Sequence, residues 1–271
     1  MSEGTDDRAR LEREEFARGH IEPGQEPVEP RPAATMVLAR SSSDGLELLF
    51  LRRPDEARFA AGAYVFPGGV VDPEDEVPEP EERLGEEVTR EEPAALAAAL
   101  REGFEETGLL PADRLPEADE LARAREELLR DETDLAALVR RWDLTFRGLR
   151  AAYFARWVTP ARLSRRYDAR FFLAEHRGGE PSLVHEEHTE AAWIGPSEAM
   201  RRYEAGELPM LFPTRKTVAA LEGFGSLEAA LEAFRRRRVT PVRPRLLVTD
   251  EAVVPVLPGE DGYERAALDR T

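Results

Sequence analysis

Alternating apolar and polar positions predict that the ordered part of the chain begins with two strands. Residues 34–40 and 46–52 are apolar, partly alternating runs, and the polar segment from Ser41 to Gly45 between them is typical of a turn. We therefore expect an antiparallel hairpin. Apolar and aromatic runs bounded by turn or polar residues indicate three further strands, at residues 146–159, 170–174 and 191–194.

Helical periodicity dominates the middle and the last third of the chain. Residues 94–110 follow a proline, are rich in Ala and Leu, and reach Gly108, which suits the left-handed position after a helix. Leucines recur at helical spacing between residues 112 and 143, which predicts one or two amphipathic helices there. Further helices are expected at residues 198–200 with Ser197 as the N-cap, at residues 213–221, and at residues 227–238 with Ser226 as the N-cap.

These elements predict an α/β fold in which three parts of the chain can be distinguished. Residues 1–33 are charged and Pro-rich, and we expect a disordered tail. Residues 34–200 are expected to form the main domain, and the acidic, Pro-containing stretch from 77 to 92 is interpreted as a solvated loop within it. Residues 201–271 are expected to form a helical extension and an arm, with a closing strand near residues 246–254.

Composition narrows the possible partners and compartments. The chain has 38 Lys and Arg against 55 Asp and Glu, a net charge of −17, so binding to nucleic acid or to an anionic membrane is not expected. It contains no Cys, which excludes disulfides, thiolate nucleophiles and Cys-ligated zinc. No apolar run approaches the length of a membrane span and no hydrophobic signal core is evident, so the expected location is cytoplasmic.

Three carboxylates share one face of the helix predicted at residues 94–110. Glu102, Glu105 and Glu106 are spaced i, i+3 and i+4, and like charges at this spacing repel one another by a few tenths of a kcal/mol per pair. A divalent cation such as Mg2+ would reverse that cost, because hard cations prefer carboxylate oxygens. In so acidic a chain, the three glutamates alone are better explained as a solvated acidic face, so the residues around them decide the interpretation.

The residues around these glutamates extend the pattern. Residues 101–109 (REGFEETGL) resemble the second half of the Nudix box, and residues 69–75 resemble its first half, with Gly69 at the opening glycine and Asp75 where Glu is usual. Gly103 replaces an aliphatic residue of the family pattern. The two halves are 25 residues apart where the family has seven, an insertion of 18 residues.

This resemblance to the Nudix hydrolases implies a fold, a cofactor and a reaction. The fold would be an α/β/α sandwich with a mixed sheet, with helical additions at about 112–143 and at the C-terminus. Glu102, Glu105 and Glu106 would hold Mg2+ or Mn2+, and Arg101 would orient them and pair with Asp75. Glu102, Glu105 and Arg101 would thereby serve hydrolysis of a P–O–P bridge in a nucleoside diphosphate derivative. Such enzymes often pair into homodimers.

The segment before the box bears on the substrate. Residues 49–69 (LFLRRPDEARFAAGAYVFPGG) resemble a signature of Nudix enzymes that cleave coenzyme A, which implies substrate binding by Arg53, Arg58, Gly68 and Gly69. Arginines offer planar, permanently charged donors to phosphate oxygens, including a 3'-phosphate. The alternative is a pair of ordinary surface arginines, but the spacing of the signature is kept over the whole interval and favours the functional interpretation. From residue 53 to about 200 the chain resembles the peroxisomal-type coenzyme A diphosphatases with an enlarged box.

The leading hypothesis is therefore cleavage of coenzyme A or acyl-CoA to 3',5'-ADP and a phosphopantetheine. Phe50, Leu51 and Pro54 depart from the coenzyme A signature, which leaves ADP-ribose, NADH or dinucleoside polyphosphates as alternative substrates. A more distant alternative is a Nudix-like binding or regulatory module without catalysis. Assays of product release separate these three possibilities.

A glutamate outside the box is expected to take part in proton transfer, as in some members of the family. Glu187 and Glu190 precede the last predicted strand of the main domain, and the sequence does not distinguish between them or exclude that either is an exposed acid at a strand edge. His185 and His188 lie beside them. Because hard cations do not require imidazole, we interpret the two histidines as structural or solvated.

Overall fold

The computed structural model describes residues 26–77, 79–84, 92–184, 186–248 and 253–266. The tail prediction for residues 1–25 lies outside this range. In the described part, seven strands form one mixed sheet in the order β3-β2-β1-β6-β5, with β4 paired to β1 and β7 paired to β2. The strands are β1 (Arg31–Ser42), β2 (Gly45–Arg52), β3 (Tyr64–Val65), β4 (Gly68–Val70), β5 (Ala151–Val158), β6 (Tyr167–Glu175) and β7 (Glu190–Ile194).

Strand β1 is the centre of this sheet. It pairs antiparallel with β2 through the turn at Ser42 and Gly45, which confirms the predicted hairpin, and it pairs parallel with β6 on its other side. β1 begins at Arg31, so the boundary predicted after residue 33 is wrong by three residues. The strand starts earlier because the backbone of residues 31–33 pairs with residues 167–169 of β6. The local sequence gives no sign of that pairing.

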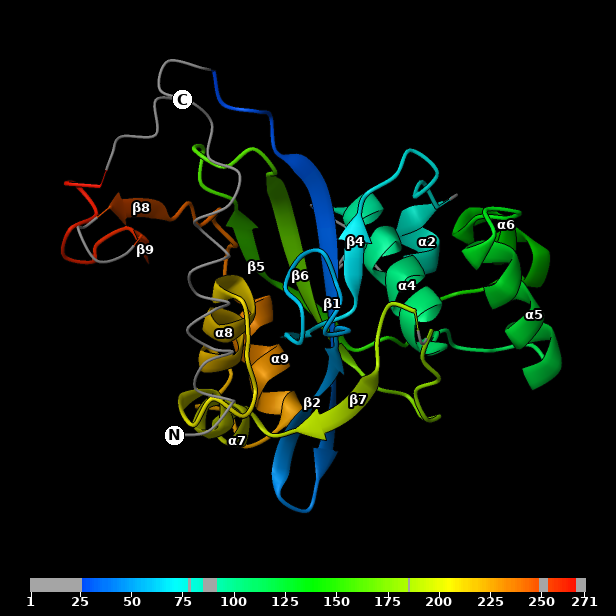
Figure 1. Ribbon diagram of the computed structural model, residues 1–271. Coiled ribbons are helices and arrows are strands. Elements are labelled where there is room, and N and C mark those ends of the chain that lie inside the picture. The colour runs from blue at the N-terminus through cyan, green and yellow to red at the C-terminus, as the bar shows by residue number, and fades with distance from the viewer. Residues whose placement is uncertain (1–25, 78, 85–91, 185, 249–252, 267–271) are drawn as a thin grey trace.

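Helices cover both faces of the sheet, as Figure 1 shows, and this confirms the predicted α/β sandwich. One face carries α4, with α2 and the inserted pair α5 and α6 beside it, and the other carries the helices of the C-terminal part. The helices are α2 (Pro80–Leu84), α4 (Pro93–Thr107), α5 (Ala118–Leu129), α6 (Leu135–Trp142), α7 (Pro196–Glu204), α8 (Phe212–Ala219) and α9 (Leu227–Arg235).

Several predicted boundaries differ from the structure for local reasons. Helix α7 starts at Pro196 with Gly195 as N-cap, because proline is suited to the first helical position, so the prediction of Ser197 as the cap is wrong. The Ser226 cap of α9 is confirmed by its hydroxyl, which accepts a hydrogen bond from the Ala229 N–H. Part of the insertion before α4 is helical rather than loop, since α2 lies within it.

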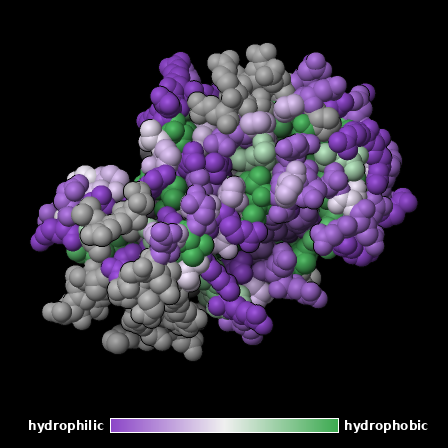
Figure 2. Space-filling view, turned by 90° about the horizontal axis from the view of Figure 1, so that it is seen from above, coloured by the Kyte–Doolittle hydropathy of each residue, from purple (hydrophilic) through white to green (hydrophobic). Residues whose placement is uncertain are grey.

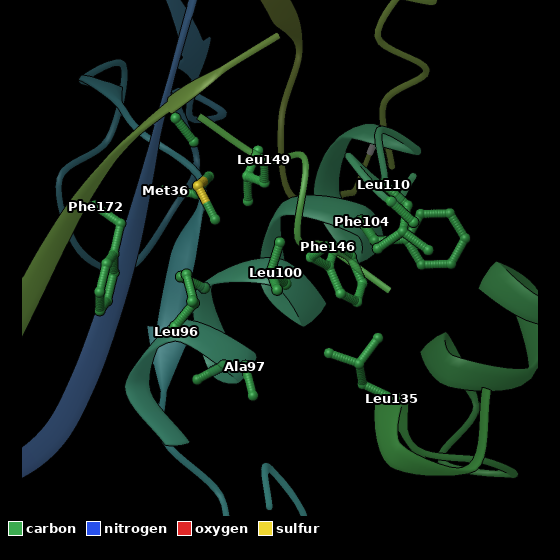
Figure 3. Close-up of a cluster of buried hydrophobic side chains, with 14 of the residues drawn as sticks. Met36, Leu96, Ala97, Leu100, Phe104, Leu110, Leu135, Phe146, Leu149 and Phe172 are labelled. Carbon is green, nitrogen blue, oxygen red and sulfur yellow. The ribbon is translucent and has the colours of Figure 1, made fainter. Parts of the chain in front are cut away.

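A hydrophobic core lies between α4 and the sheet (Figure 3). Met36 and Phe172 project from β1 and β6 toward Leu96, Leu100 and Phe104 of α4, and all five are buried. Leu135 of α6 and Phe146 extend the same core toward the inserted helices. Alternate residues of the same strands point to a second core beneath α7, α8 and α9. Helix α4 is thus fixed to the sheet by its apolar face.

This core explains the glycine at position 103, where the family pattern has an aliphatic residue. The position a Cβ would take at Gly103 lies 3.8 Å from the Met36 side chain, so the methionine occupies the neighbouring space. Phe104 beside it is almost completely buried. The apolar volume expected from that position is therefore provided by Met36 and Phe104.

The end of the described chain forms a separate hairpin. Strands β8 (Arg245–Val248) and β9 (Val253–Val256) pair antiparallel as a two-stranded sheet, which agrees with the predicted arm. The face of the molecule in Figure 2 is mostly hydrophilic, with apolar side chains in small separate areas. Among the residues described, we find no helix with the length and apolar character needed to cross a bilayer.

Candidate active site

The C-terminal half of α4 presents the predicted carboxylates beside β4. The helix starts at Pro93 and stops at Gly108, whose φ of 73° is left-handed and whose N–H donates to the Phe104 carbonyl. The face opposite its buried leucines therefore carries Glu102, Glu105 and Glu106. None of the three is well exposed: the side chains of Glu102 and Glu105 are 16% and 17% accessible, and Glu106 as a whole is 9% accessible.

The glycines of β4 lie directly against these carboxylates. A Cβ at Gly69 would overlap the carboxylate of Glu102, and one at Gly68 would overlap the carbonyl oxygen of Ala34 on β1. The N–H of Gly68 donates to the carboxylate of Glu106. The sequence pattern predicted that the acidic turn and the glycine segment meet, and the structure brings them together.

Arg101 connects the two halves of the box. Its Nε and Nη2 donate to both oxygens of Asp75 at 2.8 and 3.0 Å, and Asp75 is 2% exposed. Its Nη2 also donates to the Val70 carbonyl oxygen at 3.0 Å, and its Nη1 donates to Glu102 at 2.9 Å and to Glu105 at 3.3 Å. Arg101 therefore pairs with Asp75 as predicted, and it fixes two of the carboxylates.

The carboxylates are held in a state that favours binding of positive charge. Burial, opposed by the charge of Arg101, raises the pKa of Glu102 and raises that of Glu105 to about 7. Burial and the charges of Glu102 and Glu187 raise the pKa of Glu106 well above its usual range. Although burial alone would lower the pKa of Arg101, its hydrogen bond to Asp75 and its acidic neighbours raise it. A divalent cation would neutralise the repulsion between these buried carboxylates.

A second group of donors meets the same face from the loop before β7. Ligand atoms of Glu106, Glu187 and His188 all lie within 4.8 Å of one another. His188 is 1% exposed, and its Nε2 is 3.9 Å from Oε2 of Glu106. Burial and the charge of Arg53 lower the pKa of His188 to about 4, so the ring is neutral.

The structure separates the two glutamates that the sequence left equivalent. Glu190 is the first residue of β7 and pairs with Arg52, and its carboxylate accepts a hydrogen bond from the Tyr64 hydroxyl at 3.0 Å. Tyr64 belongs to the core on the face of the sheet opposite α4. Burial and this hydrogen bond raise the pKa of Tyr64 to about 12. Glu190 is therefore not brought to the acidic helix face, whereas Glu187 is.

The two arginines of the substrate signature occupy different positions. Arg53 lies close enough for its charge to act on both Glu106 and His188, and its Nε donates to the Phe59 carbonyl at 3.2 Å. Arg58 is exposed, beside Phe59, whose side chain is half exposed. A tight loop holds this segment, in which the Pro54 carbonyl accepts from the N–H groups of residues 57 and 62.

Arg125 of the inserted helix α5 is a residue that the sequence pattern did not single out. Its Nε and Nη2 donate to the Glu105 carbonyl at 2.9 and 2.8 Å, and Nη2 also donates to the Ser182 carbonyl at 2.7 Å. The Ser182 N–H in turn donates to the Thr107 carbonyl at 2.8 Å. Arg125 therefore ties the last turn of α4 to the loop that carries Glu187. Helical periodicity predicted the helix but contains no signal for this contact.

The donor set fits a divalent cation. The side chains of Glu102 and Glu105 are mostly shielded from solvent, and Oε2 of Glu106 is buried with no hydrogen-bond partner among the described residues. An unpartnered buried carboxylate oxygen is costly unless a cation or a proton satisfies it. The carboxylate oxygens match the preference of Mg2+ and Mn2+.

Comparisons with known proteins agree with this geometry. No family model matches the chain. It is 26% identical to the acyl-coenzyme A diphosphatase NUDT19 of Gallus gallus over 80% of this chain and 72% of that protein. It is also 26% identical to the protein of the same name from Homo sapiens, over 90% of this chain and 82% of that one.

Among solved structures, a NUDIX hydrolase from Alicyclobacillus acidocaldarius is 31% identical. It superposes with a TM-score of 0.64 over 76% of this chain and 96% of that one. This relative, together with the paired box halves, the buried Arg101–Asp75 contact and the carboxylates against the β4 glycines, shows that the chain belongs to the Nudix hydrolase family.

Proposed function

We propose that this Nudix hydrolase cleaves the pyrophosphate bond of coenzyme A or acyl-CoA, with Mg2+ or Mn2+ as cofactor. The products would be 3',5'-ADP and phosphopantetheine or its acyl derivative. The main support for the proposal is that Arg53 lies near the box carboxylates. Its charge is close enough to Glu106 to lower the pKa of that carboxyl group. A diphosphate bound at the carboxylates through a cation would thus have a permanent donor beside it.

In this mechanism each side chain has a definite task. Glu102, Glu105 and Glu106 would hold the cation, which when bound neutralises phosphate oxygens and makes a bound water acidic. Arg101 keeps Glu102 and Glu105 in place through its hydrogen bonds, and it is itself held at β4 by the Val70 carbonyl and by Asp75. Glu187 has an exposed carboxylate beside Glu106 and would accept the proton of the attacking water.

The coenzyme A assignment is supported by where the signature departs from the family pattern. Phe50 and Leu51, which replace the usual residues, are both completely buried in β2, one in each core. They therefore serve packing and do not reach the substrate. Arg58 is exposed on the same loop as Arg53 and is free to contact the 3'-phosphate of coenzyme A. Two relatives are named acyl-coenzyme A diphosphatases, which agrees with this choice.

A substrate panel tests the proposal. The protein is incubated with coenzyme A, dephospho-coenzyme A, ADP-ribose, NADH and a dinucleoside tetraphosphate, each with Mg2+ and with Mn2+, and products are identified by mass. We expect 3',5'-ADP from coenzyme A and slower cleavage of dephospho-coenzyme A. Arg58→Ala should reduce this preference for the 3'-phosphate, and Arg123→Ala, an exposed arginine on α5, should not. AMP release from the other compounds without turnover of coenzyme A would remove the assignment.

The binding-module alternative has its own test. Glu105→Gln should abolish metal-dependent turnover while the fold is retained, because it removes a carboxylate charge without changing side-chain size. Glu126→Gln provides the matched control, since Glu126 is a largely exposed residue of α5. Absence of turnover in the wild-type protein on every compound of the panel would support the non-catalytic alternative.

A further inference from the structure

The loop before β7 places the imidazole of His188 next to Glu106, the last carboxylate of the box. In this loop the Val184 carbonyl accepts hydrogen bonds from the N–H groups of Glu187 and His188, both at 3.0 Å. The next residue, Thr189, is fixed to β2 because its N–H donates to the Arg52 carbonyl at 2.9 Å. The turn and this anchor hold both side chains beside Glu106.

His188 does not have the partners expected of a structural histidine. A buried imidazole in a folded protein ordinarily donates or accepts through its ring nitrogens. Nδ1 of His188 is buried with no hydrogen-bond partner among the described residues, although the side chain is only 2% exposed. The facing Oε2 of Glu106 is buried and unpartnered as well, and the gap of 3.9 Å between Nε2 and Oε2 is too long for a hydrogen bond.

A cation between Nε2 of His188 and Oε2 of Glu106 would give that buried carboxylate oxygen the partner it lacks. When both carboxyl groups are ionised, as they would be with a cation bound, Glu106 and Glu187 together outweigh the single positive charge of nearby Arg53. The donor atoms lie within 4.8 Å of one another, which allows one ion to contact all three after small side-chain rotations. One oxygen of Glu187 suffices for this, so its other oxygen stays available to accept a proton.

We infer that His188, Glu106 and one oxygen of Glu187 form a mixed nitrogen–oxygen cation subsite, which makes the enzyme bind Mn2+ more tightly than Mg2+. The inference rests on the proposed use of a cation at α4 and corrects the interpretation of His188 as structural or solvated. Imidazole suits transition-metal ions, whereas Mg2+ strongly prefers oxygen ligands. The metal preference of this chain is thus assigned to a residue outside the box.

Pulsed electron paramagnetic resonance of the full-length protein with Mn2+ tests the ligand directly. We expect modulation from a directly bound imidazole nitrogen in the wild type and its loss in His188→Gln. His176→Gln is the matched control, because His176 is a partly buried histidine that packs on Trp193 and should leave the signal unchanged. Lack of nitrogen coupling in the wild type, or coupling that persists in His188→Gln, would overturn the inference.

Calorimetric titration supplies the second readout. His188→Gln should weaken Mn2+ binding about 10-fold or more and Mg2+ binding less than about threefold. Equal weakening for both ions would show that the ring has no part in selection and would contradict the inference. Since His188 is buried, Glu187→Gln, which changes an exposed side chain, guards against loss of fold and should also weaken Mn2+ binding. Metal binding is measured without substrate, so failure to cleave coenzyme A would leave the subsite test intact.

Discussion

Glu105→Gln in the metal-free protein is the change whose effect on stability is most informative. Burial and the charges of Glu102 and Asp75, opposed by Arg101, raise the pKa of Glu105 from 4.5 to about 7. The folded state therefore binds the Glu105 proton more tightly than the unfolded state does. It follows that the free energy of unfolding falls as pH rises from about 4.5 to about 7, and that Glu105 is destabilising above this window.

The size of the effect follows from the same shift. A pKa raised from 4.5 to about 7 corresponds to at most about 3 kcal/mol above pH 7. Residual exposure and screening by solvent reduce this to about 1–2 kcal/mol. At roughly 2–4 °C per kcal/mol for a chain of this size, the Gln variant should melt about 2–8 °C above the wild type at high pH.

Differential scanning calorimetry in EDTA, at about pH 5 and about pH 8, measures this difference. The variant and the wild type should differ clearly at the higher pH and much less at the lower one. Added Mg2+ should then raise the melting temperature of the wild type more than that of the variant, since the variant has lost a ligand. Glu126→Gln should show neither effect. A variant that melts below the wild type at the higher pH would refute the claim that the carboxylates are held in mutual repulsion.

Three other substitutions have defined outcomes. Gly69→Ala should lower kcat by about 10²-fold, since the new methyl group would displace the adjacent carboxylate, whereas Gly223→Ala, with open space around it, should leave turnover unchanged. Arg125→Met should lower kcat about 10-fold with little change in KM and partial rescue by Lys, and Arg123→Met should not. Glu190→Gln should stay within about threefold of wild-type turnover, because strand alternation directs Glu190 away from α4.

The acidic helix face was predictable because it depends on local periodicity. The spacing of Glu102, Glu105 and Glu106 fixes their common face in any helix, and Gly108 marks the helix end. The meeting of this face with Gly69 could also be predicted, because a known family pattern joins the two segments across the insertion. The hairpin of β1 and β2 was predictable for a similar reason, since its turn is local.

What the sequence did not determine depends on tertiary contacts. Glu187 and Glu190 have similar sequence surroundings, and only the start of β7 decides which of them faces α4. His188 becomes a candidate ligand because it is buried and has almost no contact with solvent water. No local sequence pattern reveals this burial. Arg125 contacts the box helix through the packing of an inserted helix, at a sequence separation of 20 residues from Glu105.

The most direct measurement of the central claim is the mass of the products formed from coenzyme A in water enriched in oxygen-18. We expect 3',5'-ADP and phosphopantetheine, with a single heavy oxygen in the newly formed phosphate of one of them, and only when Mg2+ or Mn2+ is present. Intact coenzyme A in the presence of either ion, or cleavage products that carry no oxygen-18, would contradict the claim.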